Sequence, residues 1–168
     1  MANPTTRPTV HLLVGLPCSG KSAFAVKLAS STGAYRLTPD EWQIRLFGND
    51  TTDPDHDHRH SQIEDIMWDI AGELVIRGLD VIMDFGFWTA EEREQVARRV
   101  VSLGAEPAWY YLDTPTATIR ARLVERNQDP SYTLKIPPPM MEEWITVFEA
   151  PTINETLLGP LTCVTEEH

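Results

Sequence analysis

Cysteine is scarce in this sequence, and long apolar runs are absent. Only two cysteines occur among 168 residues, Cys18 and Cys163, and they form no CxxC pair. This excludes a disulfide framework and a cysteine-rich zinc site, and it favours a reducing compartment. No run approaches the roughly 20 apolar residues of a membrane span, and the first residues lack the apolar core of a signal peptide. We therefore expect a cytoplasmic protein without a membrane segment.

Basic residues are also few. The sequence has 14 lysines and arginines against 25 aspartates and glutamates, which gives a net charge of -11. Such a charge disfavours loose attraction to nucleic-acid phosphates or to anionic lipid. A neutral or cationic small molecule is therefore the expected partner. The 42% of hydrophobic residues is enough for the core of one domain over residues 1–168.

Short apolar runs alternate with segments of helical periodicity along the chain. The runs at 9–14, 34–37, 79–84, 107–113 and 161–164 have the composition and length of strands. Helical patterns occur at 21–30, 38–48, 61–78, 89–104, 115–127 and 141–148, whereas the polar residues 49–60 are expected to form an exposed loop. This alternation predicts an α/β fold with a mostly parallel, five-stranded sheet flanked by helices.

A phosphate-binding motif follows the first expected strand. Residues 15–22, GLPCSGKS, match the pattern GxxxxGK[ST] between a strand and a helix, which is the context that the motif requires. In such a loop the backbone N–H groups surround phosphate oxygens, the lysine reaches the β and γ phosphates, and the hydroxyl binds Mg²⁺. The alternative is a glycine-rich turn with a chance lysine. The motif predicts a three-layer P-loop NTPase fold and a nucleotide site formed by Gly15, Pro17, Cys18, Ser19, Gly20, Lys21 and Ser22.

A carboxylate follows the second expected strand. Thr38, Pro39 and Glu41 have the pattern of a helix start with a capping box. Asp40, in the first turn of this helix, is favoured by the helix dipole alone. In a parallel sheet, however, ligands gather at the carboxyl ends of the strands. Asp40 is therefore expected on the same rim as the P-loop, where it can orient or deprotonate an incoming hydroxyl.

Four segments together resemble a known family. GLPCSGKS, LTPDEW, VIMDFGFW with Arg93 downstream, and YLDTPTATIRARLVERN are similar to the small P-loop kinases that include polynucleotide kinase, chloramphenicol phosphotransferase and zeta-toxin relatives. The resemblance extends from about Val10 to about Glu155. It implies transfer of the γ-phosphoryl group of ATP, with Mg²⁺, to an acceptor hydroxyl. It also implies that Asp40 is the general base.

The same resemblance implies a helical lid at about 115–140 whose arginines clamp the transferring phosphates. Arg120, Arg122 and Arg126 lie in the matching segment. Arg122 and Arg126 share a helix face because they are one turn apart, so both can reach one triphosphate. We rank Arg126 first. A solvated basic helix face is the alternative, chiefly for Arg120.

Other polar and aromatic residues are candidates for acceptor or metal binding. Asp84 ends a buried apolar run, where it can bind the acceptor or a water on Mg²⁺, or serve only as a turn residue. Phe85, Phe87 and Trp88 can line the acceptor pocket or belong to the core, and Trp88 is the better candidate for the pocket. Arg93 can contact the acceptor or a phosphate, although an exposed helical arginine is the simpler reading. The three histidines of HDHRH, residues 56–60, favour a segment that contacts the acceptor over a specific metal site.

We favour an ATP-dependent phosphotransferase acting on the hydroxyl of a small molecule. A 5′-hydroxyl polynucleotide kinase is the first alternative. In that family an arginine lies three residues after the base, whereas here Gln43 occupies this position and Arg45 lies two residues further on. This difference weakens the alternative and leaves Arg45 as a candidate acceptor contact. A nucleotide-gated binding protein without catalysis is the third hypothesis, and the combination of Asp40 with an arginine lid argues against it.

Overall fold

The computed structural model describes residues 7–165, and five strands form one sheet within them. The strands are β1 Thr9–Val14, β2 Tyr35–Leu37, β3 Val81–Gly86, β4 Glu106–Leu112 and β5 Leu161–Val164. Their order across the sheet is β2-β3-β1-β4-β5. Each pair of neighbours is parallel. The predicted five-stranded sheet is confirmed, and among the described residues it is parallel throughout.

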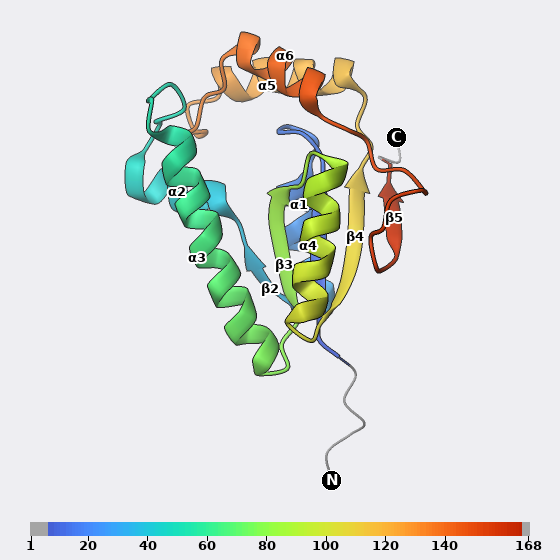
Figure 1. Ribbon diagram of the computed structural model, residues 1–168. Helices are drawn as coiled ribbons and strands as arrows, with labels where there is room; N and C mark the ends of the chain where they lie inside the picture. The colour runs from blue at the N-terminus through green and yellow to red at the C-terminus, as the bar shows by residue number, and fades with distance from the viewer. Residues whose placement is uncertain (1–6, 166–168) are drawn as a thin grey trace.

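The helices form two layers around this sheet and a third group across its upper end. They are α1 Lys21–Thr32, α2 Pro39–Phe47, α3 His56–Ile76, α4 Ala90–Ser102, α5 Thr116–Gln128 and α6 Pro138–Val147. Figure 1 shows α3 and α4 in front of the sheet, α1 behind it, and α5 and α6 above the ends of the strands. This is the predicted three-layer arrangement. No helix in the described part of the chain combines the length and apolar composition needed to cross a membrane.

The side chains of β1 alternate between the two faces of the sheet and pack against the helices on both sides. Leu12 and Val14 are fully buried in a cluster with residues of α3 and α4, including Met67 and Ala97. Leu13 points the opposite way and joins a cluster with residues of α1 and β3. Because successive side chains of a strand point to opposite faces, one apolar run supplies both cores. The β1 strand is therefore the buried centre of the sheet.

A separate apolar cluster joins the α5–α6 segment to the loop that follows β1. Leu16, in this loop, packs with Ile119 and Leu123 of α5, and Ile136 and Met141 belong to the same cluster. All of these side chains are at most 5% exposed. The loop after β1 and the helices above it therefore share one small core.

Three element boundaries differ from the sequence-based prediction. Strand β3 runs to Gly86, so that Asp84 lies within the strand, not at its end. Helix α3 begins at His56, five residues before the predicted start, and Asp50 and Thr51 of the supposed exposed loop are buried. Helix α6 begins at Pro138, because proline is tolerated in the first turn of a helix, where its missing N–H has no partner to lose.

On α4, the environment of Arg93 differs from the one that the sequence predicted. Its side chain is 0% exposed and its guanidinium donates two hydrogen bonds to Glu155, at 2.7 and 2.8 Å. A third bond, of 3.0 Å, reaches the carbonyl oxygen of Phe87. The reading of Arg93 as an exposed helical residue is wrong, since it links α4, the end of β3 and the segment before β5 inside the protein.

Removing Arg93 is expected to destabilise the fold strongly. In Arg93→Ala, the Glu155 carboxylate and the Phe87 carbonyl lose their donor, and breaking a buried ion pair in this way costs about 3–5 kcal/mol. The free energy of unfolding, measured by urea denaturation, should fall by that amount. Arg98→Ala is the matched control, because Arg98 is 69% exposed and pairs with Glu94 one turn away; its effect should stay within about 0.5 kcal/mol. Equal stability of the two variants would contradict this account.

Candidate functional site

The loop after β1 has the backbone conformation of a tight phosphate cradle. Gly15, Cys18 and Gly20 have positive φ angles of 152, 64 and 95°. A Cβ on Gly15 would lie 2.7 Å from Ser19 Oγ, so only glycine fits this position. The loop is also tied to its neighbours, because the Gly15 N–H donates to the Gly86 carbonyl at 3.0 Å and Lys21 Nζ donates to the Leu16 carbonyl at 2.8 Å.

This loop forms one wall of a cleft of about 910 Å³. The other walls come from the start of α2, the start of α3, the end of β3 and the α5–α6 segment. The predicted site residues that line it are Pro17, Cys18, Gly20, Lys21, Ser22, Asp40, Asp84, Trp88, Arg122 and Arg126. The structure thus brings together predicted residues from four separate segments. The sequence pattern had placed the P-loop, Asp40 and Asp84 on one rim and the arginines in a lid.

Two acidic groups and one lysine interact electrostatically at the base of the cleft. Burial lowers the pKa of the Lys21 ammonium, and the nearby Asp84 and Asp40 carboxylates act against this effect. Burial likewise raises the pKa of Asp84, against the influence of Lys21 and of hydrogen bonds from Ser22 and Thr38. Ser22 and Asp84 therefore provide two adjacent oxygen donors beside the loop, and oxygen is the ligand type that Mg²⁺ takes.

Thr38 has a different partner from the one its sequence context predicts. It is the N-cap of α2, yet its side chain makes no capping hydrogen bond. Instead its hydroxyl donates to Asp84 Oδ2 at 3.2 Å and accepts a hydrogen bond from Arg36. Glu41, the other half of the expected capping box, pairs with Arg36 at 2.7 Å. The prediction of a capping box at 38–41 is therefore wrong. Thr38 instead donates a hydrogen bond to the buried Asp84 carboxylate of β3.

The arginines of α5 lie in different environments. Arg122 donates to the carbonyl oxygen of Cys18 at 3.3 Å, which fixes it against the phosphate loop. Arg126 lies 5.3 Å from the centre of the Tyr132 ring, and its Nε is buried without a hydrogen-bond partner in the described part of the chain. Arg120 is exposed and holds Glu142 of α6 at 2.7 Å, outside the cleft lining. Arg45 is also exposed and does not line the cleft.

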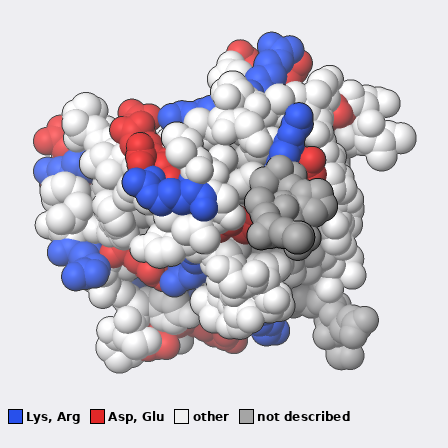
Figure 2. All heavy atoms as spheres, turned by 90° about the horizontal axis from the view of Figure 1, so that it is seen from below, with Lys and Arg blue, Asp and Glu red and all other residues white. Residues whose placement is uncertain are grey.

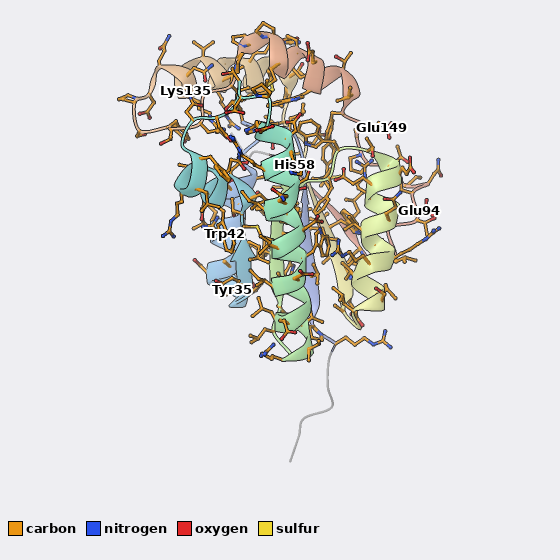
Figure 3. The ribbon with its side chains drawn as sticks, turned by 60° about the vertical axis from the view of Figure 1, so that its left-hand side comes forward. Tyr35, Trp42, His58, Glu94, Lys135 and Glu149 are labelled. Carbon is orange, nitrogen blue, oxygen red and sulfur yellow. The ribbon has the colours of Figure 1, made fainter. Side chains whose placement is uncertain are left out.

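The first turns of α3 supply a wall that the sequence analysis assigned to a loop. His56, Asp57, His60 and Ser61 all line the cleft, whereas His58 does not. Figure 3 shows the end of α3 that carries His58 facing the segment that carries Lys135. Within the segment 56–60, His56, Asp57 and His60 thus line the cleft, and their contact with an acceptor stays a prediction. The helical form of this segment was missed, because seven polar residues in succession, from His56 to Gln62, conceal the helical period.

A buried aspartate fixes this end of α3. Asp50 Oδ1 lies 2.8 Å from His56 Nδ1, and its other oxygen accepts hydrogen bonds from Gln43 at 2.6 Å and from Arg59 at 3.2 Å. These contacts lower the pKa of Asp50, although burial alone would raise it. The Nδ1 atom of His56 is therefore already engaged by the Asp50 carboxylate. Among the described residues no group of three or more histidine, cysteine or acidic side chains is arranged to hold a metal ion.

A second hollow, of about 560 Å³, adjoins the phosphate loop. Its lining joins Ser19 and Gly20 of the loop to the ends of β4 and β5, at Leu112, Thr114, Val164 and Thr165. The Thr114 hydroxyl donates to the Ser19 carbonyl at 2.9 Å and holds these segments together. The sequence gives no local motif for this hollow, because the packing of β4 against β5 creates it.

Solved structures of several kinases share this fold. A putative kinase from Chloroflexus aurantiacus has a TM-score of 0.72 at 17% identity, with 95% of this chain and 89% of that chain covered. The APS kinase of Mycobacterium tuberculosis, solved with AMPPNP and APS, has a TM-score of 0.61 at 18% identity, with 96% and 90% covered. A chain of the Pnkp1/Rnl/Hen1 RNA repair complex has a TM-score of 0.70 at 22% identity, with 92% of this chain but 51% of that one covered.

Structural similarity at such low sequence identity shows only a shared fold. A match to the sequence model of a family identifies the family. A comparison with curated proteins by sequence finds no match. The AAA_33 model, described as an AAA domain, matches residues 10–151, most of the chain. The matched range contains the phosphate loop, Asp40, Asp84 and the α5 arginines. The chain therefore belongs to the AAA_33 family of AAA domains, and its fold is that of the P-loop kinases.

Proposed function

We propose that the protein is an ATP-dependent phosphotransferase that moves the γ-phosphoryl group to a hydroxyl of a small molecule. The observation that carries this proposal is the meeting of Lys21, Asp40 and Asp84 in one cleft closed above by the α5 arginines. A phosphate cradle alone does not distinguish kinases from other P-loop proteins. A carboxylate across the cleft from the cradle is the feature that phosphoryl transfer to a hydroxyl requires.

In this proposal the triphosphate lies along the loop from Gly15 to Ser22, and the base and ribose extend toward the hollow at Thr114 and Val164. The related fold of an APS kinase solved with AMPPNP supports a nucleotide here. Ser22 and Asp84 would hold Mg²⁺, directly or through water. The bound metal would neutralise charge on the phosphate oxygens. Lys21, freed from the Leu16 carbonyl, would reach the same oxygens.

Transfer needs a proton acceptor and positive charge around the moving group. Asp40 takes the proton of the acceptor hydroxyl as its oxygen bonds to the γ phosphorus, and the bond from that phosphorus to the β–γ bridging oxygen breaks to leave ADP. Arg126 and Arg122 stabilise the charge that collects on the phosphoryl oxygens. Residues at about 115–140 then act as a lid that excludes water from this step.

The 5′-hydroxyl polynucleotide kinase hypothesis has less support from the charges. Gln43, at the position where that family has an arginine, is fully buried and bonded to Asp50, so it cannot bind a nucleic-acid phosphate. Figure 2 shows basic and acidic side chains interspersed on the face at the opposite end from the cleft. A single-stranded nucleic acid instead needs a groove of positive charge along its backbone.

A transfer assay with γ-labelled ATP separates these hypotheses. We expect label to pass to a compound of low molecular mass in a metabolite extract, and to require Mg²⁺. An oligonucleotide with a free 5′-hydroxyl should remain unlabelled under the same conditions. Efficient labelling of the oligonucleotide would favour the polynucleotide kinase. Release of inorganic phosphate alone would favour the nucleotide-gated binding protein.

Loss of the Asp40 carboxylate should slow turnover and spare nucleotide binding. For Asp40→Asn we expect kcat to fall by about 10² to 10⁴, the usual contribution of a general base, with the affinity for MgATP within about threefold of wild type. Glu41→Gln is the matched control, because Glu41 is the adjacent carboxylate and pairs with Arg36 away from the cleft. Wild-type kcat in D40N at saturating acceptor would contradict the role of Asp40.

The α5 arginines offer a second matched comparison. Arg126→Ala should lower kcat by about 10³ or more, the lower end of the effect of an arginine that stabilises phosphoryl transfer. Arg120→Ala should change kcat by less than about threefold, because an exposed ion pair with Glu142 contributes little. Initial rates at saturating ATP measure both. An equal loss in the two variants would show that the effect comes from disturbing α5, and the clamp role of Arg126 would be rejected.

A further inference from the structure

Arg126 lines the cleft without an acidic partner. Within residues 7–165 its guanidinium makes no hydrogen bond and no ion pair, although its Nε atom is buried. Burial lowers the pKa of Lys21, and the positive charge of Arg126 acts in the same direction, so the two cations are within electrostatic reach of each other. A buried donor without an acceptor is costly. An anion between Arg126 and Lys21 would supply the missing acceptor.

The partner that Arg126 does have is an aromatic ring. The carbon at the centre of its guanidinium lies 5.3 Å from the centre of the Tyr132 ring, whereas Arg120 on the same helix is paired with the carboxylate of Glu142. A carboxylate cancels the charge of an arginine and occupies its N–H donors. A ring face attracts the same cation but leaves its charge and its in-plane donors available to a phosphate.

The nearest acid in the sequence does not change this picture. Glu125 precedes Arg126 and also lines the cleft. Consecutive residues of a helix do not face each other, and no ion pair joins these two side chains in the described part of the chain. The Tyr132 ring is therefore the contact that locates the Arg126 guanidinium.

Burial in a core does not account for the place of Tyr132, because this residue is 49% exposed and lines the cleft. A turn after α5 carries it. The Tyr132 N–H donates to the Asp129 carbonyl at 3.2 Å, and the Ser131 N–H donates to Asp129 Oδ1 at 2.8 Å. These bonds turn the chain back at the end of the helix that contains Arg126.

Further contacts close the base of this loop. The side-chain amide of Asn127 donates to the Ile136 carbonyl at 2.7 Å and accepts from the Ile136 N–H at 3.1 Å. Lys135 Nζ donates to the Arg126 carbonyl at 3.2 Å. Ile136 is 3% exposed and belongs to the apolar cluster that contains Leu16. The loop that carries Tyr132 is thus fixed to the same turn of α5 from which the Arg126 side chain extends.

We propose that Tyr132 is a positioning residue for Arg126, whose ring holds the guanidinium at the phosphate end of the cleft with its charge unneutralised. This inference rests on the proposed function, because it takes Arg126 as a ligand of the terminal phosphate. An arginine side chain loses much rotamer freedom when it is ordered. A ring that orders it beforehand lowers the cost of binding the phosphate.

Comparison of two nucleotides isolates this contact, because AMPPNP carries a terminal γ phosphate and ADP does not. Both are titrated with Mg²⁺ into the full chain by calorimetry. We expect Tyr132→Leu to lower the preference for AMPPNP over ADP by about 3- to 10-fold, the range of a cation–π contact in a partly exposed site. The affinity for ADP should stay within about twofold of wild type, which shows that the phosphate loop is intact. Tyr132→Phe keeps the ring and should keep the wild-type preference.

Tyr35→Leu is the matched control. Tyr35 is a tyrosine of similar exposure, 55%, and it lines neither hollow beside the phosphate loop. Figure 3 shows it well away from the segment that carries Lys135. The same substitution there should leave both affinities unchanged. An equal loss of preference in Y35L and Y132L would overturn the inference.

A double variant separates positioning of Arg126 from a direct effect of the ring on the nucleotide. Arg126→Ala should itself lower the preference for AMPPNP. Addition of Tyr132→Leu to R126A should change it by less than about twofold, because the ring then has no guanidinium to hold. A further loss in R126A as large as in the wild type would overturn the positioning role.

The remaining outcomes separate this inference from the function on which it rests. An unchanged preference in Y132L, or a loss in Y132F equal to that in Y132L, would overturn the role of the ring even if AMPPNP binds normally. An unchanged preference in R126A would overturn it as well. Failure of the wild type to bind AMPPNP and ADP would instead reject the proposed function, and this inference with it.

Discussion

The parallel pairing of β1, β2 and β3 is the constraint on which the site depends. Because the three strands are neighbours and point the same way, the residues that follow or end them reach one edge of the sheet. Lys21 and Ser22 come after β1, Asp40 after β2, and Asp84 from the last part of β3. Reversal of any one strand would place its acidic or basic group at the other edge, about 20 Å away for a strand of six residues.

A second constraint holds the α5 arginines over the cleft. Leu16 is both a residue of the phosphate loop and a member of the apolar cluster that includes Ile119 and Leu123. Motion of α5 is therefore coupled to the loop that would carry the phosphates. The hydrogen bond from Lys135 N–H to Asn49 at 3.1 Å ties the far end of the same segment to the loop before α3. The cleft proposed to hold nucleotide and acceptor thus lies between elements that share direct contacts.

The sequence predicted most of this architecture because its strong signals are local. The phosphate loop, the helix start at Thr38 and the periodic part of α3 each lie within a few consecutive residues. The errors arose where long-range contacts decide the outcome. Arg93 is buried because Glu155, far along the chain, neutralises it, and no pattern around Arg93 indicates that partner.

The first turns of α3 illustrate the same limit at the site itself. A polar run with Pro54 suggested an exposed loop, yet the buried Asp50 accepts bonds from Gln43, His56 and Arg59 and orders the helix from His56 onward. Because the helix begins at His56 and not at Ser61, its helical turn decides which residues of the segment face the cleft. Asp57 and His60 line it and His58 does not. The sequence could therefore predict that this segment reaches the cleft, but not which of its residues line it.

A crystal structure with Mg²⁺ and AMPPNP bound is the most direct test of the central claim. The account predicts the γ phosphate between Lys21 and Arg126, with the Asp40 carboxylate facing it across a gap that one hydroxyl group fills. A nucleotide bound outside the 15–22 loop would contradict the account. So would a bound nucleotide whose terminal phosphate lies beyond the reach of any acceptor held by residue 40.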